Sequence, residues 1–213
     1  MSTTYRTLVR MEIKIQKMNK IIQLFAICIL TSCQTEPAKI NSYFNEHKQK
    51  GIIELISFFK NEICNSNYSD EVFKTEINKI KESFINGDAT YTGLNIKDIS
   101  EFTEELNSKY KLNIFTKECS THTLDREKTI KYFCISSKSN FRNYLNKNKS
   151  LKKSWTNLNN ELTAIGVLSS NSIRYLLTDE DGINTNSVDE MLVLAVTIMQ
   201  NEFQKNAEKQ LKN

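Results

Sequence analysis

The sequence predicts a mainly α-helical, compact domain with one small β-hairpin, and an α+β fold is the alternative. Apolar residues recur at the three- and four-residue spacing of a helix face along most of the chain after residue 41. Two short segments between residues 112 and 136 are instead rich in β-branched and aromatic residues, as strands are. The 213 residues include five glycines and one proline, which disfavours Gly-rich phosphate-binding folds and turn-dense sandwiches.

Two helices are expected at the start of the domain. The first lies within 41–64, whose apolar residues fall on one helix face. The second begins at Ser69 or Asp70, because both side chains suit an N-cap, and it ends at Gly87. The apolar positions of the two helices are Ile52, Leu55, Ile56, Phe59 and Ile63, followed by Phe73, Ile77, Ile80 and Phe84.

A third helix and a hairpin follow. Asp98 and Glu101 stand at the spacing of a capping box and predict a helix behind them. The segments 112–115 and 129–135 then predict two strands joined by a polar loop around 125–128. A helix over the second of these segments is left open as an alternative.

The last part of the domain is expected to be helical again. Ser187 and Glu190 form a second capping-box pattern, and the helix behind them carries apolar residues on two faces. Such a helix is normally buried, so we expect it to be the central helix, followed by a polar tail over 204–213. Earlier helical segments are marked by Phe141, Tyr144 and Leu145, by Trp155, Leu158, Leu162 and Ile165 before Gly166, and by 173–177.

The N-terminal segment has the pattern of an export signal. Five basic residues and one acidic residue lie within 1–32, whereas 33–213 contain 24 of each, so the net charge of +4 belongs to this leader. After Lys20, an apolar run extends from Ile21 to Leu30 with one polar interruption. A bilayer span needs about 20 residues, so this run has instead the length of a signal-peptide core.

The end of the apolar run, Leu30-Thr31-Ser32-Cys33, resembles the lipobox of bacterial lipoproteins. The resemblance implies that the signal is cleaved before Cys33 and that the sulfur atom of this cysteine carries a lipid. In this family the lipid is a diacylglyceryl group and the new amino group is often acylated as well, so the resemblance implies two or more acyl chains, which make a stable anchor. An ordinary signal peptide with a chance cysteine is the alternative.

This resemblance divides the chain into a cleaved leader and one mature domain. Residues 1–32 are the signal, of which 1–17 are either a long basic region or a mis-assigned start before Met18. Residues 33–40 are the lipidated cysteine and a polar tether, and 41–203 are the helical domain. No Asp directly follows the cysteine, which favours the outer membrane in a two-membrane cell, with the periplasmic or surface face left open.

Three cysteines remain in the mature chain if Cys33 is lipidated. An exported domain permits a disulfide bond, and three thiols allow three pairings. We favour Cys119–Cys134, because antiparallel pairing of the two predicted strands would place these residues nearly opposite each other. The alternative is that Cys64, Cys119 and Cys134 are all buried free thiols.

A basic stretch begins in the predicted hairpin and continues beyond it. No acidic residue lies between Glu127 and Glu161, whereas eight Lys and Arg residues do. Part of this stretch, called the basic face below, is a candidate surface for an anionic partner such as lipid head groups, cell-wall polymer or an acidic protein. A solvated face balanced by acids elsewhere is the more common interpretation of such a stretch, and nucleic acid is not expected for an exported, tethered domain. The basic face consists of Arg142, Lys147, Lys149, Lys152 and Lys153.

Sequence patterns for metal binding and catalysis are incomplete. Cys119 and His122 give one Cys-x-x-His pair, while zinc needs four ligands, or three and a water. The segment 179–190 begins with Asp and ends with Glu as a calcium loop does, but Gly182 stands at its fourth position instead of its sixth. No Walker loop, dinucleotide fingerprint or hydrolase motif occurs. We therefore expect no metal, no cofactor and no assigned catalytic residue.

The sequence favours a lipid-anchored envelope protein that binds a macromolecule, either a protein or a cell-wall polymer. An immunity or inhibitor protein is one form of this function. The alternative is an anchored enzyme acting on cell wall or glycan, with a carboxylate pair assembled from distant positions. A deep pocket with paired carboxylates would favour the enzyme, and a flat charged face would favour the binding protein.

Overall fold

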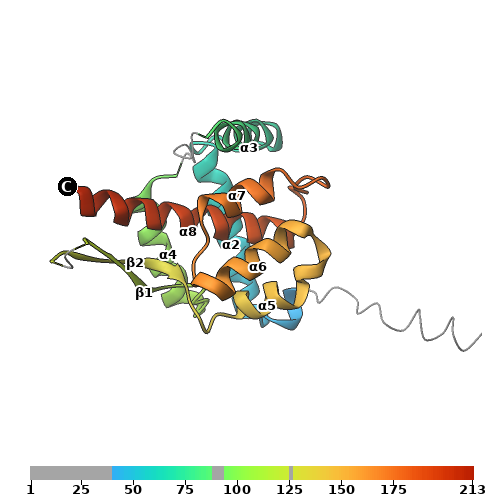
Figure 1. Cartoon of the computed structure of the whole chain (residues 1–213). Coiled ribbons are helices and arrows are strands. Elements are labelled where there is room, and N and C mark those ends of the chain that lie inside the picture. Colours follow the sequence, from blue (N-terminus) through green and yellow to red (C-terminus); the bar gives the residue numbers. More distant parts are fainter. Residues whose placement is uncertain (1–39, 88–93, 125–126) are drawn as a thin grey trace, which may run out of the picture. The chain divides into compact units, whose positions relative to one another are not determined.

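The mainly helical fold with one antiparallel hairpin is confirmed (Figure 1). The structure is a computed structural model that describes residues 40–87, 94–124 and 127–213. The leader, Cys33 and all but the last residue of the tether lie outside these residues. The elements are η1 (Ile40–Ser42), α2 (Glu46–Ile63), α3 (Asp70–Ile85), α4 (Ile96–Tyr110), β1 (Phe115–His122), β2 (Thr129–Ile135), α5 (Asn140–Asn148), η2 (Lys149–Leu151), α6 (Lys153–Ile165), α7 (Ser170–Leu177) and α8 (Val188–Lys212).

Helix α8 is the central helix of the domain, as expected (Figure 1). It contacts α2, α4, α7 and both strands, and every residue from Met191 to Asn201 is buried. The helix continues to Lys212, so most of the segment 204–213, expected as a polar tail, extends it, and Ala207 is buried within this extension. Among the described residues, no helix is both long enough and apolar enough to cross a membrane.

Side-chain caps define where the helices begin. The hydroxyl of Ser69 accepts a hydrogen bond from the backbone N–H of Val72, and that of Ser187 accepts one from the N–H of Glu190, so both expected N-caps are confirmed. The prediction of a capping box at Asp98 and Glu101 is wrong, because both residues lie inside α4.

Helix α4 begins earlier than this box would allow. The N-cap is Asn95, whose Oδ1 accepts a hydrogen bond from the N–H of Lys97 at 3.0 Å. Asn caps a helix as well as Asp does, and the earlier start lets Ile96 pack against the core.

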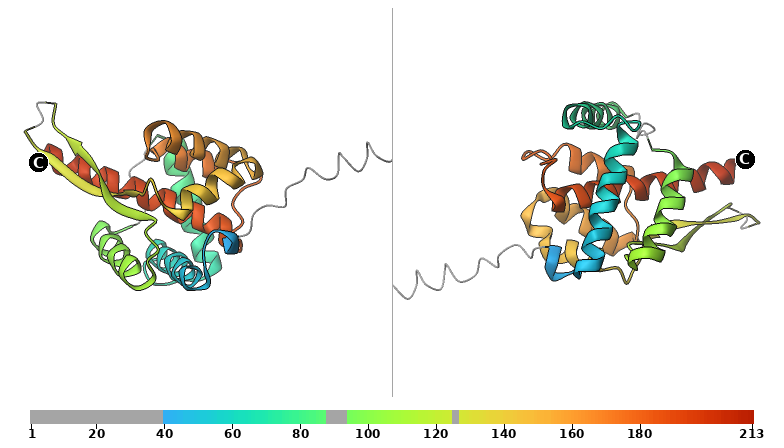
Figure 2. Two further views of the ribbon diagram at one scale, coloured as in Figure 1. Left: turned by 90° about the horizontal axis from the view of Figure 1, so that it is seen from below. Right: turned by 180° about the vertical axis from the view of Figure 1, so that it is seen from behind.

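The hairpin matches its prediction in β2 but not in β1. Strand β1 begins at Phe115, where the expected strand over 112–115 would have ended, because the backbone of Asn113 is in the left-handed region with a φ of 48° and cannot continue a strand. The register pairs Phe115 with Ile135, and a bulge follows before the pairing of Cys119 with Tyr132. The two strands lie along the C-terminal half of α8, where the ring of Phe203 packs against rings from both (Figure 2, left).

Helices α5 and α6 and the turn η2 between them carry the five residues of the basic face. Helix α6 packs against α5 on one side and α7 on the other, and α7 in turn contacts α8. The ring of Tyr144 on α5 lies 6.0 Å from the ring of Trp155 on α6. The hydroxyl of Tyr144 donates a hydrogen bond to Asp189 in the first turn of α8 at 2.7 Å, so this surface is fixed to the central helix.

Candidate functional site

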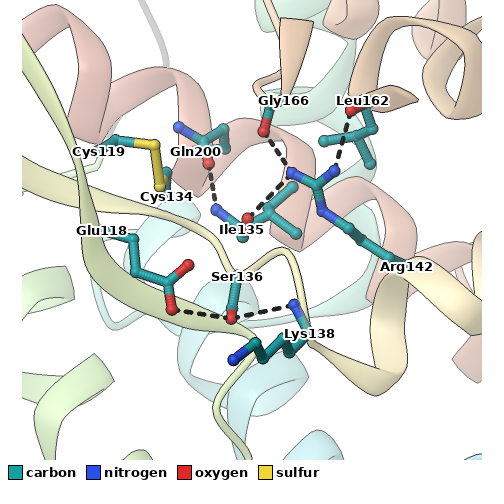
Figure 3. The surroundings of a disulfide bond; sticks show 10 residues. All are labelled: Glu118, Cys119, Cys134, Ile135, Ser136, Lys138, Arg142, Leu162, Gly166 and Gln200. Carbon is teal, nitrogen blue, oxygen red and sulfur yellow. Dashed lines mark hydrogen bonds between the residues drawn. A yellow bond between two sulfur atoms is a disulfide. The ribbon is translucent and has the colours of Figure 1, made fainter. Parts of the chain in front are cut away.

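The disulfide bond expected between Cys119 and Cys134 is present (Figure 3). The two cysteines are not directly opposite, because Cys134 pairs in register with Thr116 and the bulge displaces Cys119 toward Tyr132. Cys64 is buried as a free thiol. The bond joins β1 to the end of β2 that leads into α5.

Arg142 joins three elements beside this hairpin (Figure 3). Its Nη1 donates to the carbonyl oxygen of Leu162 at 2.9 Å, and its Nη2 donates to those of Gly166 at 2.5 Å and Ile135 at 3.2 Å. Leu162 and Gly166 lie at the C-terminal end of α6, where a positive charge is favoured. Burial lowers the pKa of the guanidinium and the charge of Glu118 opposes this, but an arginine remains charged.

Lys152 also makes contacts within the domain. Its Nζ lies 2.8 Å from Oε2 of Glu190 and 2.8 Å from the carbonyl oxygen of Gly182, and its side chain is only 15 % exposed. Glu190 also accepts a hydrogen bond from the N–H of Asn184 at 2.7 Å. This carboxylate of the calcium-like segment therefore holds the loop before α8 together.

The five residues of the basic face thus separate into two groups. Arg142 and Lys152 bind carbonyl oxygens and a carboxylate of their own domain. Lys147, Lys149 and Lys153 are exposed on α5, η2 and the first turn of α6. These three ammonium groups are the part of the basic face that a partner can reach.

Two polar pockets flank the exposed lysines. The first, called the amide pocket, lies between α5 and α6 with a volume of about 370 Å³ and is lined by the side chains of four asparagines. The second, called the acidic pocket, has a volume of about 520 Å³ and lies between the start of α6 and the end of α7. The asparagines of the amide pocket are Asn143, Asn146, Asn159 and Asn160, and the carboxylates of the acidic pocket are Asp179, Glu180 and Asp181.

The carboxylates of the acidic pocket face cations of the same domain. Lys152 and Lys153 line the same pocket. Oδ2 of Asp179 accepts a hydrogen bond from the N–H of Ser154 at 3.2 Å, close to the N-terminus of α6. Burial raises the pKa of Asp179, but hydrogen bonding by Ser154 and the charge of Lys152 outweigh it and hold this pKa below its usual value. A lowered pKa suits an ionised helix cap and is opposite to what a general acid needs.

The sequence patterns weighed for metal binding do not come together in space. Among the described residues, no group of three His, Cys, Asp or Glu side chains is placed to hold a metal ion. Cys119 of the Cys-x-x-His pair is bonded to Cys134, which removes its thiolate. Cys33 lies outside the described residues.

The asparagines of the amide pocket were missed by the sequence analysis. Asn143 and Asn146 stand three residues apart on α5, and Asn159 and Asn160 are adjacent on α6. Taken singly, each asparagine has the character of an ordinary surface residue. The one sequence signal was their position within the segment that contains no carboxylate.

Comparisons of this chain with known protein families, with curated proteins and with solved structures found no match. The exposed lysines and the two pockets are the features that a functional proposal has to explain.

Proposed function

We propose that this chain is a lipid-anchored bacterial envelope protein whose helical domain binds an anionic macromolecule through the exposed lysines of its basic face. The lipobox-like sequence ending at Cys33 supports the anchor and the location, with the outer membrane favoured. The Cys119–Cys134 disulfide supports export, because such bonds persist in oxidising compartments. An immunity or inhibitor protein acting on an envelope toxin or hydrolase is one form of this function.

One observation carries the binding proposal. The segment between Glu127 and Glu161 contains no carboxylate, and it folds so that Lys147, Lys149 and Lys153 remain exposed on consecutive elements. A cluster of one sign attracts partners of the opposite sign and speeds their association. Arg142 and Lys152 already have partners inside the domain. They therefore stabilise the fold of the basic face and are not counted among the residues that contact the macromolecular partner.

The enzyme alternative has less support. The acidic pocket contains three carboxylates, but Asp179 is bound to Ser154 at the start of α6, and Lys152 and Lys153 stand beside it. Glycoside cleavage needs one carboxylic acid with a raised pKa opposite a second carboxylate. Asp179 has the opposite shift, so it does not supply the acid.

The binding proposal is tested by affinity capture with the full chain in detergent and without reductant, against envelope and secreted proteins and wall polymers. The test variant carries Lys147→Glu, Lys149→Glu and Lys153→Glu. A control variant carries Lys50→Glu, Lys97→Glu and Lys209→Glu, which make the same charge change at exposed positions outside the basic face. We expect the partner to be lost with the first variant and kept with the second. Equal capture by both variants would reject the basic face as the binding surface.

The anchor is tested separately by the intact mass of the membrane-extracted protein. We expect a chain that begins at Cys33 and carries acyl groups. An unmodified cysteine, or a chain cleaved elsewhere, would reject the lipoprotein assignment.

A further inference from the structure

The amide pocket has an unusual lining for a groove between two helices. Its asparagines extend from α5 and α6 toward the same volume of about 370 Å³, which lies within the ordinary size range of small-ligand sites. Among the described residues, the side chains of Asn143, Asn159 and Asn160 have no hydrogen-bonding partner. Three primary amides are therefore open to a ligand.

Asn159 is the most informative of these amides. It is only 7 % exposed, but its side-chain amide forms no hydrogen bond to any described residue. The little exposure that remains is in the pocket, which Asn159 lines, and its amide atoms are not among the fully buried atoms without a partner. Its amide is therefore held in place by the surrounding side chains and can be reached only from the pocket side, by water or by a ligand.

The residues that line the pocket include two cations and no carboxylate, whereas carboxylates line the acidic pocket on the other side of the basic face. Lys149 lies at its rim, exposed, with its Nζ 3.2 Å from Oδ1 of Asn146. Arg142 contributes to the wall, with its guanidinium held by carbonyl oxygens. A ligand that carries one anionic group would meet Lys149 without repulsion from a nearby acid.

The lining also discriminates between classes of ligand. Leu162 is the one apolar residue among those that line the pocket, so apolar side chains of a peptide would find little surface to cover. A ring with several hydroxyl groups offers both donors and acceptors, as the primary amides do. We propose that the amide pocket binds an acidic sugar, with the hydroxyl groups on the asparagine amides and the carboxylate on Lys149. This inference deepens the proposed binding function and rests on it.

The probe is glucuronate, titrated by calorimetry into the full chain in a sugar-free detergent, with glucose as the uncharged comparison. We expect saturable binding of glucuronate and weaker binding of glucose. Lys149→Gln should lower the affinity for glucuronate about three- to tenfold, as expected for one charge-assisted contact near the surface, and leave that for glucose unchanged. The matched control Lys147→Gln removes an exposed charge two residues away that does not line the pocket, and should change neither affinity.

A second variant keeps the test independent of charge. Asn160→Ala removes an exposed amide from the pocket, so folding should be retained and the affinities for both sugars should fall together. Absence of saturable glucuronate binding overturns the inference, and so does binding that neither Lys149→Gln nor Asn160→Ala weakens. Equal binding of a short acidic peptide also overturns it.

The outcome separates this inference from the proposed function. If partner capture depends on the three exposed lysines but glucuronate does not bind, only the proposal of a sugar site is rejected. If glucuronate binds but capture of the macromolecular partner is unchanged by the three Lys→Glu substitutions, the basic face is rejected as the macromolecular binding surface and the sugar site in the amide pocket is supported.

Discussion

The backbone N–H of Ile135 donates a hydrogen bond to Oε1 of Gln200 at 2.7 Å, in the buried contact between β2 and α8 (Figure 3). Gln200 is completely buried in the middle of the central helix, and Ile135 is the last residue of β2. A buried N–H without a partner is costly, so the side chain of Gln200 supplies a hydrogen bond that the two-stranded sheet does not. The same Ile135 accepts a hydrogen bond from Arg142, which connects the central helix to the basic face.

Gln200→Leu should therefore destabilise the domain. The N–H of Ile135 would stay buried and unpaired, and we expect the free energy of unfolding to fall by about 1–2 kcal/mol, because removing the unpartnered Nε2 offsets part of the loss. Urea unfolding followed by circular dichroism measures this change. Thr197→Val is the control, since the hydroxyl of Thr197 bonds to the carbonyl oxygen of Val193 within the same helix. If the two variants lose the same stability, the contact with Ile135 is not what makes Gln200 important.

Gly51→Ala should also destabilise, although alanine is the better helix former. Gly51 lies inside α2, and a Cβ at this position would come within 2.9 Å of Cβ and Cγ of Tyr110 on α4. Alanine gains about 1 kcal/mol in helix propensity, whereas overpacking costs about 1–3 kcal/mol, so we expect a net loss near 1 kcal/mol. The measurement is the thermal midpoint, with Ser57→Ala at an exposed position of α2 as the control. A gain in stability for Gly51→Ala would show that the two helices can separate without cost.

These two positions show which parts of the fold a sequence reveals. The apolar spacing of α2 and the serine caps of α3 and α8 are local, and each was predicted. The requirement for Gly51 comes from Tyr110, far along the chain, and no local pattern contains it. Likewise, α8 continues to Lys212 although the segment itself is polar, and Ala207 within this extension is completely buried.

The candidate site was predictable to a similar degree. The absence of carboxylates between Glu127 and Glu161 is visible in the sequence, and it is the signal from which the basic face was predicted. Charge alone could not show that Arg142 and Lys152 would bind inside the domain, because their partners lie on α6, β2, α8 and the loop before it. The amide pocket could not be predicted for the same reason, since it exists only where α5 meets α6.

The carboxylate of Glu54 should make stability depend on pH. Oε2 of Glu54 accepts a hydrogen bond from the hydroxyl of Tyr110 at 2.5 Å and lies 3.1 Å from Nζ of Lys109. The hydrogen bond from Tyr110 lowers the pKa of Glu54 below 4.5, burial opposes this, and Lys109 lowers it further. A carboxylate whose pKa is lower in the folded than in the unfolded state stabilises the fold. Its contribution is complete at a pH above the unfolded-state pKa, and it is lost as the pH falls through the folded-state pKa.

Glu54→Gln should remove this contribution. At neutral pH we expect the variant to be less stable by about 1 kcal/mol, as for a hydrogen bond to a partly exposed charged group. The difference from the wild type should shrink as the pH falls below 4.5 and vanish once Glu54 is protonated in the folded state. Urea unfolding at a series of pH values measures this, with Glu46→Gln, an exposed carboxylate in the first turn of α2, as the comparison. A difference that stays constant with pH would mean that Glu54 contributes by packing and not by charge.

The disulfide bond gives the last prediction. Cys119 and Cys134 are 15 residues apart. Closing a loop of that length lowers the conformational entropy of the unfolded chain, which raises the free energy of unfolding by about 3 kcal/mol. Cys119→Ala together with Cys134→Ala should lower the unfolding free energy by a similar amount, and reductant should lower that of the wild type but not that of the variant. Cys64→Ala controls for the loss of a thiol, because Cys64 is buried but forms no disulfide.

Reduction of the disulfide should also loosen the basic face, because β2 leads directly through Ser136 into α5. The N–H of Ser136 bonds to the carbonyl oxygen of Ile114, so we expect its hydrogen exchange to become faster after reduction. Unchanged exchange after reduction would show that the contacts of Ile135 with Gln200 and Arg142 hold the junction without the covalent bond.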